Sequence, residues 1–452
     1  MSAALLTYEE AAALIADHAS HLLKLSGATE HVDLASAAGR ILARPLRADT
    51  DQPPFPRSTR DGFACRAHEA STHQPLPIAG STRAGQPPPP PLPPGSAWEI
   101  MTGAPVPSGA DAVMMIEHVE ISAGSVRLLP PRTLEPGENI VAQGAQAHAG
   151  DELLPAGAFL SAGQIALAAS CGQSALDVFP RPRVAILSTG DELVPVDRQP
   201  APGQIRNSSS PMLAAMVAAA GEPWLLPTAA DNEAALDAAL AQAAHADLLL
   251  ITGGVSAGKF DLVEPALTRA GAQFHFTGIR IQPGKPLVFA EIPRSTSTNL
   301  TPDPSSETPD RNSLISVPCS LIPDPCSPFP DPCSLIPVFG LPGNPVSSAV
   351  TFLLFAAPVL AAIAGRRDFG PRFALARLSA APGRRPKGGL TRFLPALCTF
   401  GANPGSMPEV ALVPWHGSGD LAALARSNCF LVLPDDEPQP LEAGSIVRIL
   451  LP

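Results

Sequence analysis

Between residues 181 and 366, short apolar runs alternate with amphipathic segments, and this alternation restricts the fold more than any other feature of the chain. Val184–Leu187, Leu248–Ile251 and the PVFG run ending at Gly340 predict strands, with a further short strand near Trp224. Helices are predicted from Asn207, as cap, to Gly221, and over 232–245 and 262–270. This order predicts an α/β domain with a mostly parallel sheet that is covered on both faces.

Three glycine-bearing loops leave the carboxyl ends of the predicted strands. They are STGDEL at 188–193, TGGVSAG at 252–258 and GLPGNP at 340–345. Ligands of open α/β sheets bind at this edge. Gly253, Gly254 and Gly258 permit positive φ, so backbone amides can point at phosphate oxygens. Asn344 can cap the next helix, with Pro345 at its first position. Each loop alone fits an ordinary turn, but three in one domain favour an anion site.

Charged residues accompany these loops. Asp191 and Glu192 lie in the first loop, and Asp261 follows the second. Carboxylates beside a phosphate-binding loop suit a bridging Mg²⁺ ion, which takes one or two carboxylates plus phosphate oxygens. Asp191 fits an Asx turn equally well, and Asp261 fits a helix N-cap. Lys285, between two prolines, is either an anion contact or an exposed lysine in a rigid turn.

The composition and the hydrophobic pattern of the remaining chain indicate three further modules. Residues 1–45 and 146–180 predict a helical linker domain, and 46–145, rich in Pro and Gly, predict an irregular β module. Residues 367–452 show no convincing helix period and predict a small β-barrel or sandwich. The segment 293–335 is dominated by Pro, Ser, Thr and Asp and predicts a disordered insertion in the α/β domain.

Several classes of protein are disfavoured. A net charge of −11 argues against a general nucleic-acid binder. The N-terminus predicts an amphipathic helix rather than a signal peptide, and the cysteines form no CxxC pair, which indicates a cytoplasmic protein. Cys319, Cys326 and Cys333 lie in a Pro-rich repeat that favours low complexity over metal binding. Residues 346–365 are long enough for a membrane span, but their place after a turn favours a buried helix.

Taken together, the motifs resemble those of the MoeA family of molybdopterin molybdenumtransferases, which includes the C-terminal domain of gephyrin. The resemblance runs from about Tyr8 to Leu451, apart from the insertion. The motifs are RSTRDGFA, TGAPVPSGADAV, STGDEL, TGGVSAGKFD, PGKP and GLPGNPVSSAVTF, in the family's order.

The resemblance implies a four-domain subunit that works as a homodimer with sites between subunits. The family's reaction takes molybdopterin adenylate and molybdate, hydrolyses the pyrophosphate bond with Mg²⁺, and releases AMP. Carried over by motif, Asp61, Thr102, Glu192 and Asp261 would be catalytic, with the last two as metal ligands. The expected substrate-binding residues are Ser188, Thr189, Gly190, Asp191, Thr252, Gly253, Gly254, Ser256, Gly258, Lys285, Pro342, Gly343, Asn344, Pro345, Arg392 and Ser418.

The chain departs from the family pattern at two places. Gly144-Ala145-Gln146 stands where many relatives carry Gly-Glu-Asp, and Gln282 replaces a common basic residue before PGKP. These departures leave open a preference for tungstate. Two other functions stay open: a molybdopterin adenylyltransferase, which is also a candidate partner, and a non-catalytic scaffold of the same fold. A TGG loop followed by Val255 and Ser256, together with the large β module, favours the molybdenumtransferase.

Overall fold

A computed structural model describes residues 5–25, 27–255, 262–294, 335–382, 389–401, 405–435 and 441–452. Most of the predicted insertion at 293–335 lies outside the described residues, as do Ser256, Gly258 and Asp261. The chain forms two compact units. The large unit comprises Met1–Glu30 and Phe179–Pro452, and the small unit comprises His31–Val178.

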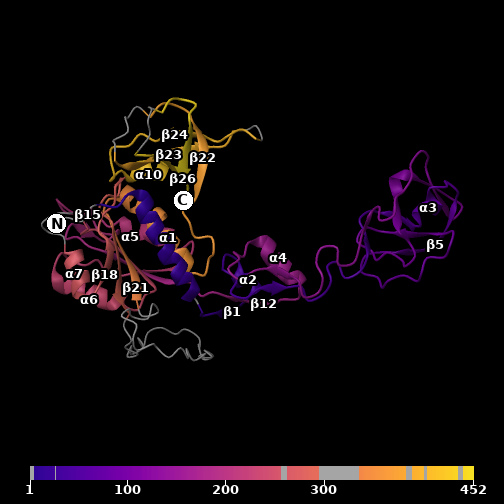
Figure 1. Ribbon diagram of the computed structural model, residues 1–452, viewed down its shortest axis with the longest axis horizontal. Helices are drawn as coiled ribbons and strands as arrows, with labels where there is room; N and C mark the ends of the chain where they lie inside the picture. Colours follow the sequence, from indigo (N-terminus) through magenta and orange to yellow (C-terminus); the bar gives the residue numbers. More distant parts are fainter. Residues whose placement is uncertain are drawn as a thin grey trace. The chain divides into compact units, whose positions relative to one another are not determined.

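The core of the large unit is a six-stranded mixed sheet (Figure 1). Its strands, in spatial order, are β16 (Glu222–Leu225), β13 (Arg183–Ser188), β17 (Leu248–Thr252), β21 (Leu335–Leu341), β20 (Val288–Pro293) and β18 (Gln273–Phe276). The first four are parallel, and β20 and β18 add antiparallel. Every residue of β17 is buried, as its continuous apolar run predicts for a parallel strand covered on both faces. The predicted α/β class is confirmed.

Helices cover both faces of this sheet, because alternate residues of each strand point to opposite sides. On one face, Ile186 and Leu250 pack with α1 (Tyr8–Leu25), α5 (Ser209–Val217), α8 (Pro345–Thr351) and α9 (Ala357–Ile363). On the other, Leu187 and Ile251 pack with α6 (Glu233–Ala243) and α7 (Val263–Arg269). Asn232 caps α6 as a side-chain acceptor from the Ala235 amide, at 2.9 Å.

Helix α5 is shorter than predicted. It ends at Val217 rather than at Gly221, because the last residues before β16 form a turn. Asn207 still accepts a hydrogen bond from the Ser210 amide (3.1 Å), which is the capping role expected of it.

The helical stretch Pro345–Ile363 is the candidate membrane span identified in the described residues. Its mean hydropathy is 2.2, but 83% of its most apolar window is buried inside the protein. A π-helical turn, Phe352–Ala356, precedes Pro358. The wider turn accommodates a proline whose ring would clash with the carbonyl of Leu354 in a regular α-helix. The stretch therefore forms a core helix, as predicted.

Helix α1 belongs to a different unit from the one that the sequence pattern predicts. The sequence predicts that residues 1–45 form one domain with 146–180, but the first thirty residues join the large unit. The apolar stripe Tyr8, Ala11, Ile15 and Ala19 is buried, and α1 packs against α9. A capping box begins this helix: the Thr7 amide donates to Glu10 Oε2 (2.8 Å), and the Glu10 amide donates to Thr7 Oγ1 (3.1 Å).

The C-terminal part of the large unit is a closed five-stranded barrel, as predicted. Its strands are β22 (Phe373–Leu378), β23 (Thr391–Thr399), β24 (Glu409–Leu412), β25 (Cys429–Leu433) and β26 (Ile446–Leu450). Closure follows because β23 pairs with both β24 and β25. The prediction of no helix is wrong, because α10 (Leu421–Arg426) begins at Asp420, whose side chain accepts from the Ala423 amide. Strand β19 (Ile281–Gln282) pairs with β23 and joins the barrel to the α/β domain.

The small unit consists mainly of short strands. Its largest sheet contains, in order, β7 (Ala112–Met115), β4 (Gly62–Cys65), β6 (Ala97–Ile100), β5 (Leu76–Thr82), β9 (Ser125–Leu128) and β8 (Val119–Ser122). Two-stranded ladders join β1 (Glu30–Asp33) to β12 (Ala175–Val178), β2 (Leu46–Arg47) to β11 (Glu152–Leu154), and β3 (Arg57–Ser58) to β10 (Ile140–Val141). Three short α-helices and a 3-10 turn (Ile116–His118) complete it; the α-helices are α2 (Leu34–Ala37), α3 (Ala67–Ala70) and α4 (Ala162–Ser170).

Candidate active site

The three glycine-bearing loops meet at one cavity of about 640 Å³ in the large unit. Strand register brings them together: Ser188 pairs with Thr252, and Thr252 pairs with Leu341, so β13, β17 and β21 end side by side. Each strand then releases its loop at the same edge of the sheet. The predicted loop residues that line the cavity are Ser188, Thr189, Glu192, Thr252, Gly253, Gly254, Pro342, Gly343, Asn344 and Pro345.

Backbone atoms of the loops approach one another closely. Gly253 has φ +95°, and a Cβ there would lie 2.5 Å from the carbonyl oxygen of Thr189. A Cβ on Gly254 (φ +62°) would lie 2.9 Å from Thr189 Oγ1. Any side chain at position 253 or 254 would therefore push the first two loops apart. The Gly253 amide donates to the carbonyl of Leu341 at 3.3 Å, so of these two glycines it is Gly254 whose amide can serve a ligand.

Buried hydroxyl groups hold the loops in register. Ser188 Oγ lies 2.6 Å from Ser210 Oγ, and Asn207 Nδ2 donates to the same Ser210 oxygen at 3.0 Å. Thr252 Oγ1 donates to the carbonyl of Pro342 at 3.3 Å. The Oγ1 atom of Thr189 is buried and, within the described ranges, has no hydrogen-bond partner. Because a buried hydroxyl without a partner is costly, Thr189 is suited to donate to a bound ligand.

Two helices begin at the cavity. Ser208 and Ser209, at the start of α5, line its wall, and Ser209 Oγ donates to the carbonyl of Gly343 (3.3 Å). Asn344 and Pro345 begin α8 on the opposite loop. Pro345 occupies the first turn, as predicted, but the Asn344 side chain makes no capping hydrogen bond. The dipole of a helix favours anions at its N-terminus, whereas the first-turn amides of Ser210 and Val346 already donate to Asn207 and to the carbonyl of Ser418.

The neighbouring carboxylates of the first loop differ in position. Glu192 lines the cavity, and its carboxylate lies over Gly190, where a Cβ would meet Oε2 at 2.5 Å. Asp191 is not among the lining residues. Its Oδ1 accepts from the Asp231 amide at 3.0 Å and ties the first loop to the segment after β16. Asp191 thus serves the turn, whereas Glu192 is available to a cation. The third predicted carboxylate, Asp261, lies outside the described residues.

A second cavity, of about 500 Å³, shares Pro286, Pro342 and Asn344 with the first. Lys285 and Ser418 line it, together with residues of the PGKP turn and of the barrel. The Val346 amide donates to the carbonyl of Ser418 (3.0 Å), which fixes the barrel loop to the start of α8. Arg392 does not line either cavity. It is buried in β23 and pairs with Gln282 of β19, the strand directly before the PGKP turn.

Asp61 and Thr102 lie together in the small unit. Asp61 precedes β4 and Thr102 follows β6, and these strands pair through Gly62 and Ile100. The Thr102 amide and hydroxyl donate to Asp61 Oδ1, at 2.6 and 2.7 Å. These bonds hold the pKa of Asp61 below its ordinary value, so this exposed carboxylate is ionised at neutral pH.

Several lining residues were not predicted from the sequence. They are Leu193, Ile205, Arg206, Ser208, Ser209, Val255, Pro286, Gly419 and Leu421. The run Asn207-Ser-Ser-Ser-Pro, directly after a short strand and at the start of a helix, was a signal that could have identified the serines. Gly419 and Leu421 belong to the barrel, and no local pattern links them to the α/β loops.

Comparison with known proteins covers nearly the whole chain. Residues 6–172 match the MoeA N-terminal region (domain I and II), 185–362 match a probable molybdopterin binding domain, and 377–451 match the MoeA C-terminal region (domain IV).

Full-length relatives agree with these matches. The molybdopterin molybdenumtransferase of Nostoc sp. is 35% identical, over 94% of this chain and 89% of that protein. The one from Haemophilus influenzae is 31% identical, over 93% of each. The crystal structure of the molybdopterin biosynthesis MoeA protein from Pyrococcus horikoshii OT3 has a TM-score of 0.73 and 25% identity, over 99% of this chain and 100% of that one. The chain therefore belongs to the MoeA family of molybdopterin molybdenumtransferases, enzymes of molybdenum cofactor biosynthesis.

Proposed function

We propose that this enzyme transfers molybdenum from molybdate to molybdopterin, with molybdopterin adenylate as the substrate and AMP as a product. The observation that carries the proposal is the convergence of three glycine-bearing loops and two helix N-termini on one cavity of about 640 Å³. The full-length relatives are named molybdopterin molybdenumtransferases, which supports the transfer of molybdenum to molybdopterin.

The first cavity would bind the pyrophosphate end of the pterin adenylate. Its donors are the amide of Gly254, the hydroxyl of Thr189, and the serines that begin α5. Arg206 adds a positive charge at the same wall. Such an arrangement of an amide, hydroxyls and a cation fits a doubly charged pyrophosphate better than a neutral ligand.

The carboxylate of Glu192 fits a Mg²⁺ ion in this cavity. Among the described lining residues it is the acidic side chain, and it lies beside the amide proposed to bind phosphate. One carboxylate plus phosphate oxygens is the ligand set that Mg²⁺ prefers in proteins. When bound, Mg²⁺ would offset negative charge on the pyrophosphate and on departing AMP. We propose that Asp261, which follows the second loop in sequence, is the second ligand.

Molybdate would occupy the second cavity. The ammonium of Lys285 and the hydroxyls of Ser347 and Ser418 line it. A tetrahedral oxyanion needs few contacts, and one cation with several hydroxyl donors supplies them. Because the two cavities share Pro342 and Asn344, the oxyanion would lie next to the pterin site.

Asp61 and Thr102 would complete the site from the small unit, in a homodimer with sites between subunits. The support is their pairing in the structure and their place in the family's motifs. We also propose a cytoplasmic location and transfer of the adenylate from the molybdopterin adenylyltransferase. The cysteines, which form no CxxC pair, support the location, and the adenylate that the family's reaction takes supports the partner.

The proposal is tested by AMP release. Purified enzyme mixed with molybdopterin adenylate, molybdate and Mg²⁺ should release AMP, and the product should activate an apo-molybdoenzyme. Removing Mg²⁺ with EDTA should abolish release, and restoring it should recover the rate. Tungstate in place of molybdate would measure the oxyanion preference.

Two results would contradict the proposal. Consumption of ATP with unmodified molybdopterin, without AMP release from the adenylate, would identify an adenylyltransferase instead. A folded protein that binds the adenylate but never releases AMP would be a scaffold.

Lys285→Gln should raise KM for molybdate by about 10- to 100-fold, because one charge-assisted contact is lost. KM for the pterin adenylate should change little. Arg206→Gln is the matched variant, because Arg206 lines the first cavity and not the second. This variant should raise KM for the adenylate instead. Steady-state AMP release with each substrate varied in turn measures both constants. Equal effects of both variants on both constants would remove the distinction between the cavities.

A further inference from the structure

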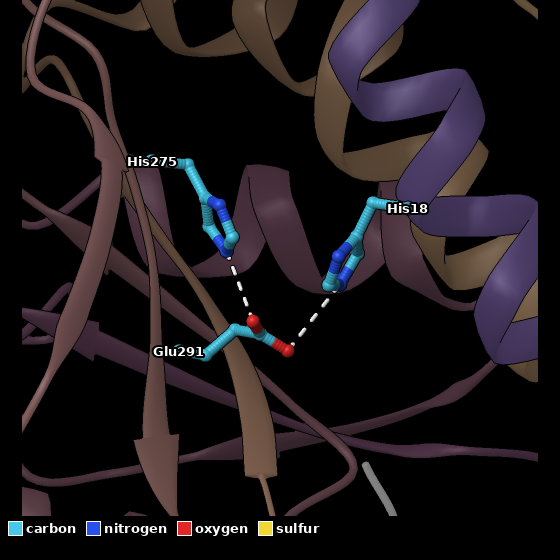
Figure 2. A group of neighbouring side chains, drawn as sticks. All are labelled: His18, His275 and Glu291. Carbon is cyan, nitrogen blue, oxygen red and sulfur yellow. Dashed lines mark hydrogen bonds and ion pairs between the residues drawn. The ribbon is translucent and has the colours of Figure 1, made fainter. Parts of the chain in front are cut away.

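A second group of potential ligands lies away from the cavities, where α1 meets the edge of the central sheet (Figure 2). It contains His18 of α1, His275 of β18 and Glu291 of β20. Their nearest ligand atoms all lie within 4.8 Å of one another. A residue of the N-terminal helix thus meets two residues of a pair of adjacent strands.

Both imidazoles turn an Nε2 atom toward the carboxylate between them (Figure 2). His275 Nε2 lies 2.9 Å from Glu291 Oε2, and His18 Nε2 lies 3.5 Å from Glu291 Oε1. The first pair forms a hydrogen bond. The second does not, and within the described residues the buried Nε2 of His18 has no hydrogen-bond partner. Hydrogen bonds among the three side chains therefore leave one nitrogen unsatisfied.

The surroundings of the two imidazoles are largely apolar. Phe289 stacks on His275, with ring centroids 4.6 Å apart, and meets His18 edge-on at 5.0 Å. Burial lowers the pKa of His18. The charged groups nearest to it beyond the cluster are His21 and Asp17 of the same helix. The side chains of His18 and Glu291 are only 15% and 12% exposed, whereas His275 is 29% exposed, so one side stays open to solvent.

The cluster is separate from the proposed active site. Val288 pairs with Gly340 at the cavity end of the sheet, whereas Glu291 pairs with Pro337, three residues earlier in β21. At ~3.4 Å per residue, this displacement is roughly 10 Å along the strand, away from the loops. A ligand at the cluster would link α1 to β18 and β20, and it would not reach the loops that line the cavity.

We propose that His18, His275 and Glu291 bind a divalent transition-metal ion of the Zn²⁺ class. Two imidazole nitrogens and one carboxylate oxygen form the three-residue ligand set of open zinc sites, with a fourth position left for water. Imidazole selects Zn²⁺, Co²⁺ or Ni²⁺ over Mg²⁺, which prefers oxygen ligands. The ion would satisfy the Nε2 of His18 and fix the N-terminal helix to the edge of the sheet. This site does not depend on the proposed reaction.

The test uses the full chain, stripped of metal with a chelator and dialysed. Titration with Co²⁺ should produce visible d–d absorption that saturates at one ion per chain, and Zn²⁺ should displace it. Zn²⁺ should also raise Tm, whereas Mg²⁺ at the same concentration should not raise it through this site. Absence of saturable Co²⁺ absorption would overturn the proposal.

Variants assign the site. Glu291→Gln and His275→Gln should weaken Co²⁺ binding at least about 100-fold, since loss of even outer ligand contacts costs 10- to 100-fold. Glu291→Gln can still accept a hydrogen bond from His275, so the metal-free fold should survive, as far-UV circular dichroism would show. The matched control is His21→Gln, whose side chain is 64% exposed on the same helix and which should bind like the wild type. Equal affinity in all four proteins, or equal loss in the control, would overturn the assignment.

Discussion

Glu192→Gln is expected to lower kcat for AMP release by about 100- to 1000-fold while leaving Tm within a degree or so of the wild type. Glu192 is the acidic side chain among the described residues that line the first cavity. Glutamine keeps its size but removes the charge that would hold Mg²⁺ against the substrate phosphates. Excess Mg²⁺ should restore part of the rate, because the remaining ligands bind the ion weakly. Single-turnover AMP release over a range of Mg²⁺ concentrations measures the effect.

The adjacent carboxylate is the control for this prediction. Asp191→Asn makes the same chemical change one residue earlier, but its Oδ1 can still accept from the Asp231 amide. We therefore expect near wild-type AMP release and stability from this variant. If both substitutions lowered the rate equally, or if neither did, the separation of a turn residue from a metal ligand would be wrong.

The sequence predicts this separation only in part, and the reason is geometric. Residues 191 and 192 are both acidic, both follow β13, and both fit a metal site or a turn by composition. What separates them is the segment after β16, which supplies the Asp231 amide to one and not to the other. That contact joins residues 40 positions apart, and no local pattern contains it.

The convergence of the three loops is more predictable. Continuous apolar runs identify β13, β17 and β21 as buried parallel strands, and parallel strands end at the same edge. Glycine marks where backbones approach. The strand register then brings the three loops together, because Ser188 pairs with Thr252 and Thr252 pairs with Leu341. The fold class and the cavity follow from strand type and order.

Contributions from outside the α/β pattern are the part that sequence reasoning misses. The antiparallel strands β18 and β20 follow one another without a helix in the segment that joins them. The alternation of strand and helix therefore does not predict them. Helix α1 has an amphipathic pattern that fits any apolar face, and the sequence does not specify that this face is α9. The same limit hides the cluster of His18, His275 and Glu291, since each residue alone has no local signature.

Gly253→Ala is expected to raise the Kd for molybdopterin adenylate by about 100-fold and to destabilise the large unit by at least about 2 kcal/mol. The added Cβ would lie 2.5 Å from the carbonyl oxygen of Thr189, and the φ of +95° is one that alanine adopts only with strain. The second loop must then move away from the first, which displaces the Gly254 amide that we propose binds phosphate. Fluorescence binding of the adenylate and urea unfolding measure the two effects.

Gly343→Ala separates this explanation from a general intolerance of the cavity to larger side chains. Gly343 lines the same cavity, but a Cβ there would meet Gly253 Cα at 3.4 Å, an ordinary contact, and its φ is not positive. The variant should bind the adenylate within a few-fold of the wild type and unfold at nearly the same urea concentration. If Gly253→Ala bound as well as Gly343→Ala does, the close packing of the first two loops would not be what positions the phosphate-binding amide.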